Sequence, residues 1–287
     1  MTRPVLPDRP RRSLLFVPAS RLDRLSKALN SGADGVIVDL EDAVPPAAKS
    51  KARQGLVDWM RQSPRTKRDG PEFWVRLNAV DTRDGLLDLL AIQSEDLSVD
   101  GVLLAKTETR RDLEIVSEVI AAGPARPLIG GLVETVRGLR NATEISAYAP
   151  LTLLMFGGAD LAGQLRVELG DRALDYARAE LVRAGAGHGR DIIDMPCVHL
   201  HDEEAVNRET VAARSLGFTG KAAIHPSQIA VIHRVLYPSE DAVRRARLIL
   251  AADRDAAGGV ALVEGRMVDK PMVAMARQTL ALAGESQ

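Results

Sequence analysis

The chain is poor in cysteine, in aromatic side chains and in long apolar runs. Cys197 is the only cysteine among 287 residues, which excludes an intramolecular disulfide and a cysteine-based zinc site and is typical of a reducing compartment. Aromatic residues make up 3% of the chain, too few for platforms that stack nucleic-acid bases. No apolar run approaches the roughly 20 residues of a membrane span, and residues 14–17 are too short for a signal-peptide core. We therefore expect a soluble, cytoplasmic protein.

The sequence also lacks an excess of charge of either sign. Lys and Arg number 38 against 39 Asp and Glu, which gives a formal net charge of −1. This balance argues against nucleic acid and anionic membranes as partners. The hydrophobic fraction of 46% is ordinary for a globular protein, and a chain of this length can bury a sizeable core. An enzyme or a protein that binds small molecules fits these bounds.

Short apolar runs alternate with segments of helical spacing along most of the chain. Eight such pairs recur about every thirty residues, as in a parallel barrel. The apolar runs cover residues 14–17, 35–40, 73–78, 101–105, 128–133, 151–156, 191–196 and 220–226. The pattern predicts an α/β protein with a (β/α)8 TIM barrel over residues 13–237.

The alternative fold is a doubly wound open sheet. Its usual glycine-rich first turn is missing, because Pro18-Ala-Ser20 stands at that place. Residues 1–12, rich in Pro and Arg, are expected to form a flexible N-terminal arm. Residues 238–287 are expected to form a C-terminal helical extension, with a turn at Gly258-Gly259, that packs on the barrel or on a neighbouring subunit.

Charged or polar side chains follow five of the eight expected strands. In a TIM barrel the carboxyl ends of the strands meet on one face, where the chemistry takes place. Two of these side chains, Glu134 and Asp160, each follow a buried-looking strand and suggest a small site for a divalent metal. Taken singly, a carboxylate at such a place is often only a helix cap or a first-turn residue, and Arg76 has a structural salt bridge as its alternative. The full set is Glu41, Asp42, Arg76, Asn78, Lys106, Glu108, Glu134 and Asp160.

Three other features carry weaker signals. His199-Leu-His201 places two imidazoles on one side of an extended segment, a weak metal signal that an exposed loop explains better. Residues 185–189 contain three glycines but follow no strand, so a helix end is favoured over a phosphate loop. Cys197 has no evident base partner and is expected to be a small buried residue.

An ordered series of short motifs covers almost the whole chain after residue 11. Together these motifs resemble the citrate lyase beta-subunit-like family, within the larger group of HpcH/HpaI aldolases and citrate lyases. Each motif alone has little specificity, whereas their combination in this order is highly specific. The motifs are Arg12-Ser-Leu-Leu-Phe-Val-Pro18, Asp39-Leu-Glu-Asp-Ala-Val44, Val75-Arg-Leu-Asn78, Lys106-Thr-Glu108, Glu134-Thr135, Phe156-Gly-Gly-Ala-Asp-Leu161, Gly217-Phe-Thr-Gly-Lys221, Ile224-His-Pro-Ser-Gln-Ile229 and Met267-Val-Asp-Lys-Pro271.

The resemblance implies a (β/α)8 barrel, usually a homotrimer, that makes or breaks a C–C bond next to a CoA thioester with the help of Mg2+. It places Glu134 and Asp160 on the metal ligands and Arg76 on the contact to the substrate carboxylate. It also places Glu41 and Asp42 on an acidic pair that holds metal-bound waters. Asp269 corresponds to the catalytic acid or base, which in relatives comes from the C-terminal segment of an adjacent subunit.

The expected function is therefore Mg2+-dependent cleavage or formation of a 3-hydroxyacyl-CoA, such as citryl-, malyl- or citramalyl-CoA, with acetyl-CoA and a 2-oxo acid as products. Arg24 and Lys27 could meet the CoA phosphates, although a solvated helix face explains both residues well. Alternatives are a CoA-independent aldolase acting on 2-oxo acids and a non-catalytic protein that binds CoA or serves as a scaffold. Citrate lyase alpha and gamma subunits are possible partners.

Overall fold

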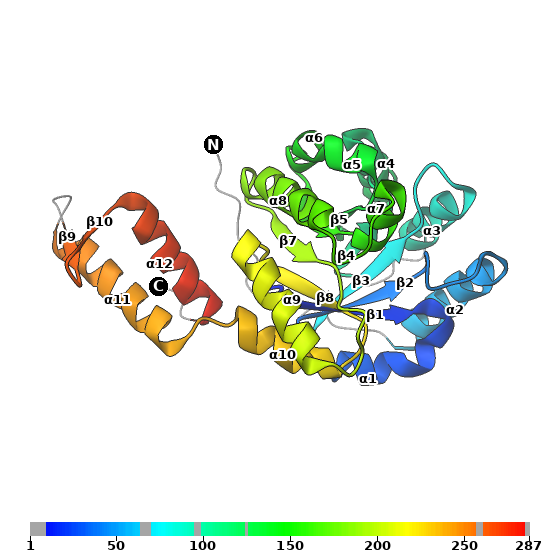
Figure 1. The fold of residues 1–287 in the computed structure, drawn as a ribbon. Helices are drawn as coiled ribbons and strands as arrows, with labels where there is room; N and C mark the ends of the chain where they lie inside the picture. Colours follow the sequence, from blue (N-terminus) through cyan, green and yellow to red (C-terminus); the bar gives the residue numbers. More distant parts are fainter. Residues whose placement is uncertain (1–9, 64–69, 95–98, 124–125, 257–260, 285–287) are drawn as a thin grey trace. The chain divides into compact units, whose positions relative to one another are not determined.

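Eight parallel strands close into a barrel in chain order, with β1 paired to both β2 and β8 (Figure 1). The computed structural model describes residues 10–63, 70–94, 99–123, 126–256 and 261–284. The strands are β1 (Ser13–Pro18), β2 (Gly35–Asp39), β3 (Glu72–Leu77), β4 (Gly101–Leu104), β5 (Leu128–Val133), β6 (Leu151–Phe156), β7 (Asp191–Asp194) and β8 (Gly220–Ala223). The predicted TIM barrel is confirmed.

Helices follow the strands, as the βα alternation requires. They are η1 (Ala19–Arg24), α1 (Leu25–Leu29), η2 (Pro46–Ala48), α2 (Lys49–Gln62), α3 (Arg83–Ser94), α4 (Arg110–Ala121), α5 (Val136–Arg140), α6 (Ala142–Ser146), α7 (Gly158–Leu165), α8 (Arg172–Ala186), α9 (Glu203–Leu216) and α10 (Ser227–Leu236). The helical spacing of Leu22, Leu25 and Leu29 predicts one helix over residues 20–30, and this prediction is wrong. Arg21 has non-helical backbone angles (φ −130°, ψ 48°) that interrupt the 3-10 segment η1, and the α-helix begins only at Leu25.

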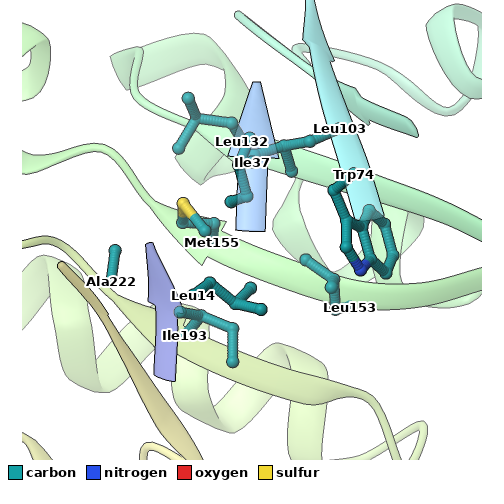
Figure 2. Close-up of a cluster of buried hydrophobic side chains, with 9 residues drawn as sticks. All are labelled: Leu14, Ile37, Trp74, Leu103, Leu132, Leu153, Met155, Ile193 and Ala222. Carbon is teal, nitrogen blue, oxygen red and sulfur yellow. The ribbon is translucent and has the colours of Figure 1, made fainter. Parts of the chain in front are cut away.

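The barrel interior is filled by apolar side chains from alternate strand positions (Figure 2). Trp74 is the largest of these fully buried side chains. Gly101, opposite it on β4, makes room for it, because a Cβ at this position would overlap the indole ring. The cluster comprises Leu14, Ile37, Trp74, Leu103, Leu132, Leu153, Met155, Ile193 and Ala222. The interior is therefore a packed core, which leaves the strand ends for polar chemistry.

A buried arginine lies at the amino ends of the strands. Arg11 binds both carboxylate oxygens of Glu72, at 2.6 and 2.9 Å, and Asp191 at 2.7 Å. Glu72 also accepts a hydrogen bond of 2.9 Å from the indole N–H of Trp74. Arg12 binds Asp34 in the same region. Residues 1–9 of the expected flexible arm lie outside the described residues, whereas its last two residues are fixed by these ion pairs.

The C-terminal residues form a second compact unit. The first unit ends at His233, before the expected barrel boundary at residue 237, and the second runs from Arg234 to the C-terminus. It contains α11 (Glu240–Asp255), the antiparallel pair β9 (Ala261–Val263) and β10 (Arg266–Val268), and α12 (Lys270–Leu282). Its own apolar core joins α11 to α12. The expected turn at Gly258-Gly259 lies outside the described residues, and the β9–β10 hairpin was not predicted.

No helix in the described part of the chain is both long enough and apolar enough to cross a membrane.

Candidate functional site

The carboxyl end of the barrel is organised by an arginine–carboxylate pair on neighbouring strands. Asp39 ends β2 and is directly opposite Arg76 on β3. The guanidinium donates from Nε to Oδ1 (2.7 Å) and from Nη2 to Oδ2 (2.6 Å), and it lies 5.2 Å from the centre of the Phe16 ring. Asp39 also accepts the backbone N–H groups of Glu41 and Ala43. Asp39 thus positions both Arg76 and the loop that carries the next two acids.

Asp39 was not among the predicted site residues. It gives the same sequence signal as Glu134, a carboxylate that ends an apolar run, but two further acids follow it within three positions. It uses two of the five guanidinium N–H groups of Arg76. A carboxylate of a substrate would have to be recognised by the N–H groups of Arg76 that point away from Asp39.

Glu41 is a buried acid shared by two cations. Its Oε1 accepts a hydrogen bond of 2.6 Å from Nζ of Lys106, and its Oε2 lies 3.3 Å from Nη1 of Arg76. The backbone N–H of Asp42 also donates to Oε2. Asp42 itself is largely exposed, and burial together with the nearby Glu41 charge raises its pKa. The two acids therefore differ: Glu41 is fixed, whereas Asp42 faces solvent.

Glu134 ends β5 as a deeply buried carboxylate, 4% exposed. Its Oε1 accepts a 2.8 Å hydrogen bond from the backbone N–H of Lys106. Gly157 makes room for it, because a Cβ at that position would overlap the Glu134 side chain. Burial raises the pKa of Glu134 to about 8; Arg76 opposes this shift, and the Glu41 charge adds to it. The surrounding positive charge therefore does not fully compensate this carboxylate.

Asp160 lies in the first turn of α7, directly after β6, and its side chain is 37% exposed. Its Oδ2 is 3.1 Å from Nζ of Lys106. The same Nζ binds Glu41, so the side chain of Lys106 joins two acids that follow different strands, β2 and β6. The first turn of a helix also favours a negative charge.

Six of the eight predicted strand-end residues are joined by these contacts: Glu41, Asp42, Arg76, Lys106, Glu134 and Asp160. The other two face different partners. Asn78 is buried against Asp88, with a hydrogen bond of 2.7 Å from its side-chain amide, and Glu108 pairs with the exposed Arg137 at 3.1 Å. Asn78 and Glu108 thus have structural contacts outside the cluster.

Glu134 and Asp160 are the carboxylates that could hold a metal ion. The described residues contain no cluster of three or more His, Cys, Asp or Glu side chains suited to a metal. Two carboxylates still fit magnesium, which prefers oxygen ligands and usually keeps several waters. Glu134 also suits a metal ion because its raised pKa shows that nearby cations do not fully stabilise its ionised form, and a divalent cation would do so.

The remaining predicted residues, Asp269, Arg24 and Lys27, are all exposed. Asp269 belongs to the C-terminal unit, where it is exposed and caps α12 by accepting the N–H of Met272 at 2.9 Å. Arg24 and Lys27 are exposed on η1 and α1, the helical turns that follow β1.

The weaker motifs have mainly structural positions. Residues 185–189 end α8, as expected for a helix end. Cys197 is buried, and desolvation raises its pKa to about 11. The exposed His201 meets the ring of the half-buried His225 edge to face, at 5.4 Å between ring centres.

Comparisons with known families agree with the motif series. The HpcH/HpaI aldolase/citrate lyase family matches residues 12–226, and a family described as C–C bond lyases of the TIM-barrel fold matches residues 178–284. A (3S)-malyl-CoA thioesterase of Cereibacter sphaeroides is 35% identical over 280 residues, covering 96% of this chain and 95% of the relative. A citrate lyase subunit beta-like protein of Mycobacterium tuberculosis is 36% identical over 279 residues, covering 95% of each chain.

Solved structures agree as well. Protein CitE of Mycobacterium tuberculosis, in complex with magnesium, acetoacetate and coenzyme A, has a TM-score of 0.79 and 33% identity. That match covers 97% of this chain and 100% of CitE. RipC of Yersinia pestis has a TM-score of 0.69 and 35% identity, with coverage of 81% of this chain and 98% of RipC.

Proposed function

The chain belongs to the HpcH/HpaI aldolase/citrate lyase family, and from this we propose that it is a magnesium-dependent carbon–carbon lyase. It cleaves, or forms, a 3-hydroxyacyl-CoA such as citryl-, malyl- or citramalyl-CoA, with acetyl-CoA and a 2-oxo acid as the other side of the reaction. The observation that supports this most directly is the cluster at the carboxyl end of the barrel. There Lys106 contacts Glu134 through its backbone and Asp160 through its side chain. The CitE relative, bound to magnesium, acetoacetate and coenzyme A, supports the ligand classes.

The two carboxylates would hold magnesium at this end of the barrel. When bound, the ion polarises the oxygen of the 2-oxo acid or of the 3-hydroxyl group. Glu41 and Asp42 stand beside the pair and would orient water through their carboxylate oxygens. Arg76, fixed by Asp39, would present its outward N–H groups to the substrate carboxylate.

In the cleavage direction, the 3-hydroxyl group loses its proton and the C2–C3 bond breaks. Its electron pair passes to the thioester as an enolate, which takes up a proton to give acetyl-CoA. Asp269 is the proposed acid or base for one of these proton transfers. Its exposed carboxyl group suits delivery from the C-terminal unit of a neighbouring subunit in a homotrimer. Arg24 and Lys27 are exposed and would meet the CoA phosphates.

Thioester hydrolysis is the second candidate, because one relative at 35% identity is a (3S)-malyl-CoA thioesterase. Hydrolysis of malyl-CoA releases free CoA and malate, whereas the lyase reaction releases acetyl-CoA and glyoxylate. The products therefore separate the two reactions directly.

The test is a screen of citryl-, malyl- and citramalyl-CoA with the purified chain, with and without EDTA, in which acetyl-CoA, free CoA and the 2-oxo acid are each quantified. Equal amounts of acetyl-CoA and 2-oxo acid, lost with EDTA and restored by magnesium, are expected for at least one substrate. Free CoA without a 2-oxo acid would replace the lyase with the thioesterase. No turnover of any thioester would contradict both.

A further inference from the structure

One lysine touches each of the acids around the proposed metal position. Lys106 donates from its backbone N–H to Glu134 and from Nζ to Glu41 at 2.6 Å, and Nζ lies 3.1 Å from Asp160. Asp42 is more distant, at 3.9 Å. A single side chain therefore supplies positive charge to the same carboxylates that would face a divalent cation.

The backbone of Lys106 is unusual for a residue with a side chain. Its φ is 50°, in the left-handed region that lysine seldom adopts. Such conformations cost free energy and persist where the surroundings hold them, often at functional sites. Here the conformation coincides with a backbone N–H bound to Glu134 and an Nζ bound to Glu41. The contacts with Glu134 and Glu41 therefore hold Lys106 in a backbone conformation that is otherwise unfavourable.

Lys106 remains charged in this position. Its Nζ donates to Glu41 and lies 3.1 Å from Asp160, so the ammonium group faces two carboxylates. Without Lys106, Glu41 would keep its 3.3 Å ion pair with Arg76, but Asp160 would lose its 3.1 Å contact with a cation.

We propose that Lys106 is the resident counter-cation of the metal site, which holds Glu41 and Asp160 in the metal-free protein and releases Asp160 to an incoming magnesium ion. This exchange of Asp160 between Lys106 and magnesium rests on one part of the proposed function, namely that Glu134 and Asp160 bind the metal. It makes Lys106 a positioning residue that sets the affinity for magnesium. A cation 3.1 Å from a metal ligand competes with the metal for that ligand.

The exchange predicts that a neutral residue at position 106 tightens magnesium binding. Calorimetric titration of Mg2+ alone, at constant ionic strength, should give about a tenfold lower Kd for Lys106→Met than for the wild type, because the competing charge is gone and the metal-free cluster is destabilised. Thermal unfolding should show a lower Tm for Lys106→Met in EDTA and a larger rise of Tm on addition of magnesium. Lys106→Arg keeps the charge and should bind magnesium within about threefold of the wild type.

Lys49 offers a matched control. It is a lysine of the same region whose Nζ donates to the carbonyl groups of Leu40 and Glu41 and to Asn78. Lys49→Met removes the same charge without removing a contact to Glu134 or Asp160. Its Kd for magnesium should stay within about twofold of the wild type, because the charge it removes is not bound to a metal ligand.

The outcomes separate this inference from the proposed function. If the wild type binds no magnesium, the proposed metal site itself is contradicted. If the wild type binds magnesium and Lys106→Met binds it equally or more weakly, only the exchange is wrong. Lys106→Asn is a second neutral variant for the case in which Lys106→Met does not fold, because asparagine adopts the left-handed backbone conformation more readily. If neither neutral variant folds even with magnesium present, the exchange is also contradicted, because the metal should replace the lost charge.

Discussion

The two ends of the barrel each contain a buried arginine paired with a carboxylate. Each buries an arginine against a carboxylate that accepts two hydrogen bonds from it: Arg11 with Glu72 at the amino end and Arg76 with Asp39 at the carboxyl end. Each guanidinium also lies close to an aromatic ring, at 5.6 Å from Trp74 and 5.2 Å from Phe16. The local chemistry is nearly identical, so the difference lies in the charges around the two pairs.

The charge of Asp34 at the amino end is better compensated than that of Glu134 at the carboxyl end, although burial also raises the pKa of Asp191 beside Arg11. Although burial opposes it, hydrogen bonds from His233 and Arg12 lower the pKa of Asp34, at the amino end, to about 2. Burial raises that of Glu134, at the carboxyl end, to about 8. Glu134 combines a strongly raised pKa with a place in a cluster of charged side chains at the strand ends, a combination typical of functional sites. We therefore assign stability to one end and chemistry to the other.

The largest expected effect concerns the acid or base proposed for the carboxyl end. Asp269→Asn should lower kcat for CoA-thioester cleavage by 10²–10⁴, roughly the usual contribution of such a group. Asn caps helices about as well as Asp, so the Tm should change little. Asp269→Ala should lose the same activity and also destabilise α12 by about 1 kcal/mol. A kcat of Asp269→Asn within about threefold of the wild type would remove Asp269 from the mechanism.

At the amino end, the effect should be on stability alone. Arg11→Met leaves Glu72 and Asp191 buried without their cation and should lower the free energy of unfolding by about 3 kcal/mol. Urea unfolding measures this change, and Arg111→Met, which removes an exposed ion pair, should show no measurable loss. Magnesium binding by the folded Arg11→Met protein should be unchanged. If Arg11→Met instead abolished magnesium binding at full stability, the division between the two ends would be wrong.

The two ends should also respond to pH in opposite directions. Glu134 has a raised pKa, so its contribution to the stability of the metal-free protein is full below about pH 4.5 and is lost as the pH rises through about 8. Asp34 has a lowered pKa, so its contribution is full above about pH 3.8 and is lost as the pH falls through about 2.

Magnesium held at the proposed site would require the ionised form of Glu134, so metal binding should depend on pH. The affinity should rise about tenfold per pH unit below pH 8, with about one proton released per ion at pH 7. Calorimetry in two buffers of different ionisation enthalpy measures the released protons. Glu134→Gln should show neither the proton release nor the alkaline loss of stability in the metal-free protein. A magnesium affinity that is flat between pH 6 and 8 would mean that Glu134 is already ionised there without metal.

The sequence was informative where strand ends carry a single charged residue. Glu134 and Asp160 follow uninterrupted apolar runs, so the barrel register alone predicts that they share one face, and their contacts with Lys106 agree with this. Asp39 was missed because Glu41 and Asp42 follow it closely. The alternating pattern of a strand does not show which of these three acids binds Arg76. The role of Lys106 depends on a left-handed backbone, which has no sequence signal in a residue other than Gly or Asn.

The amino end was harder to predict for a different reason. Arg11 is part of a short segment rich in Pro and Arg, a composition typical of a mobile arm, yet its partners Glu72 and Asp191 are 61 and 180 residues away. Only the closure of the barrel brings these residues together. The hairpin β9–β10 was missed because its strands have three residues each, too short for a periodic pattern.

The claim that the carboxyl end holds a metal through Glu134 can be tested directly by calorimetric titration of magnesium with oxaloacetate or glyoxylate into Glu134→Ala. Arg11→Met, altered at the other end, is the matched control. We expect the wild type and Arg11→Met to bind the metal and the 2-oxo acid together, and Glu134→Ala to show no ternary binding. Undiminished ternary binding by a folded Glu134→Ala protein would contradict the assignment of the metal site.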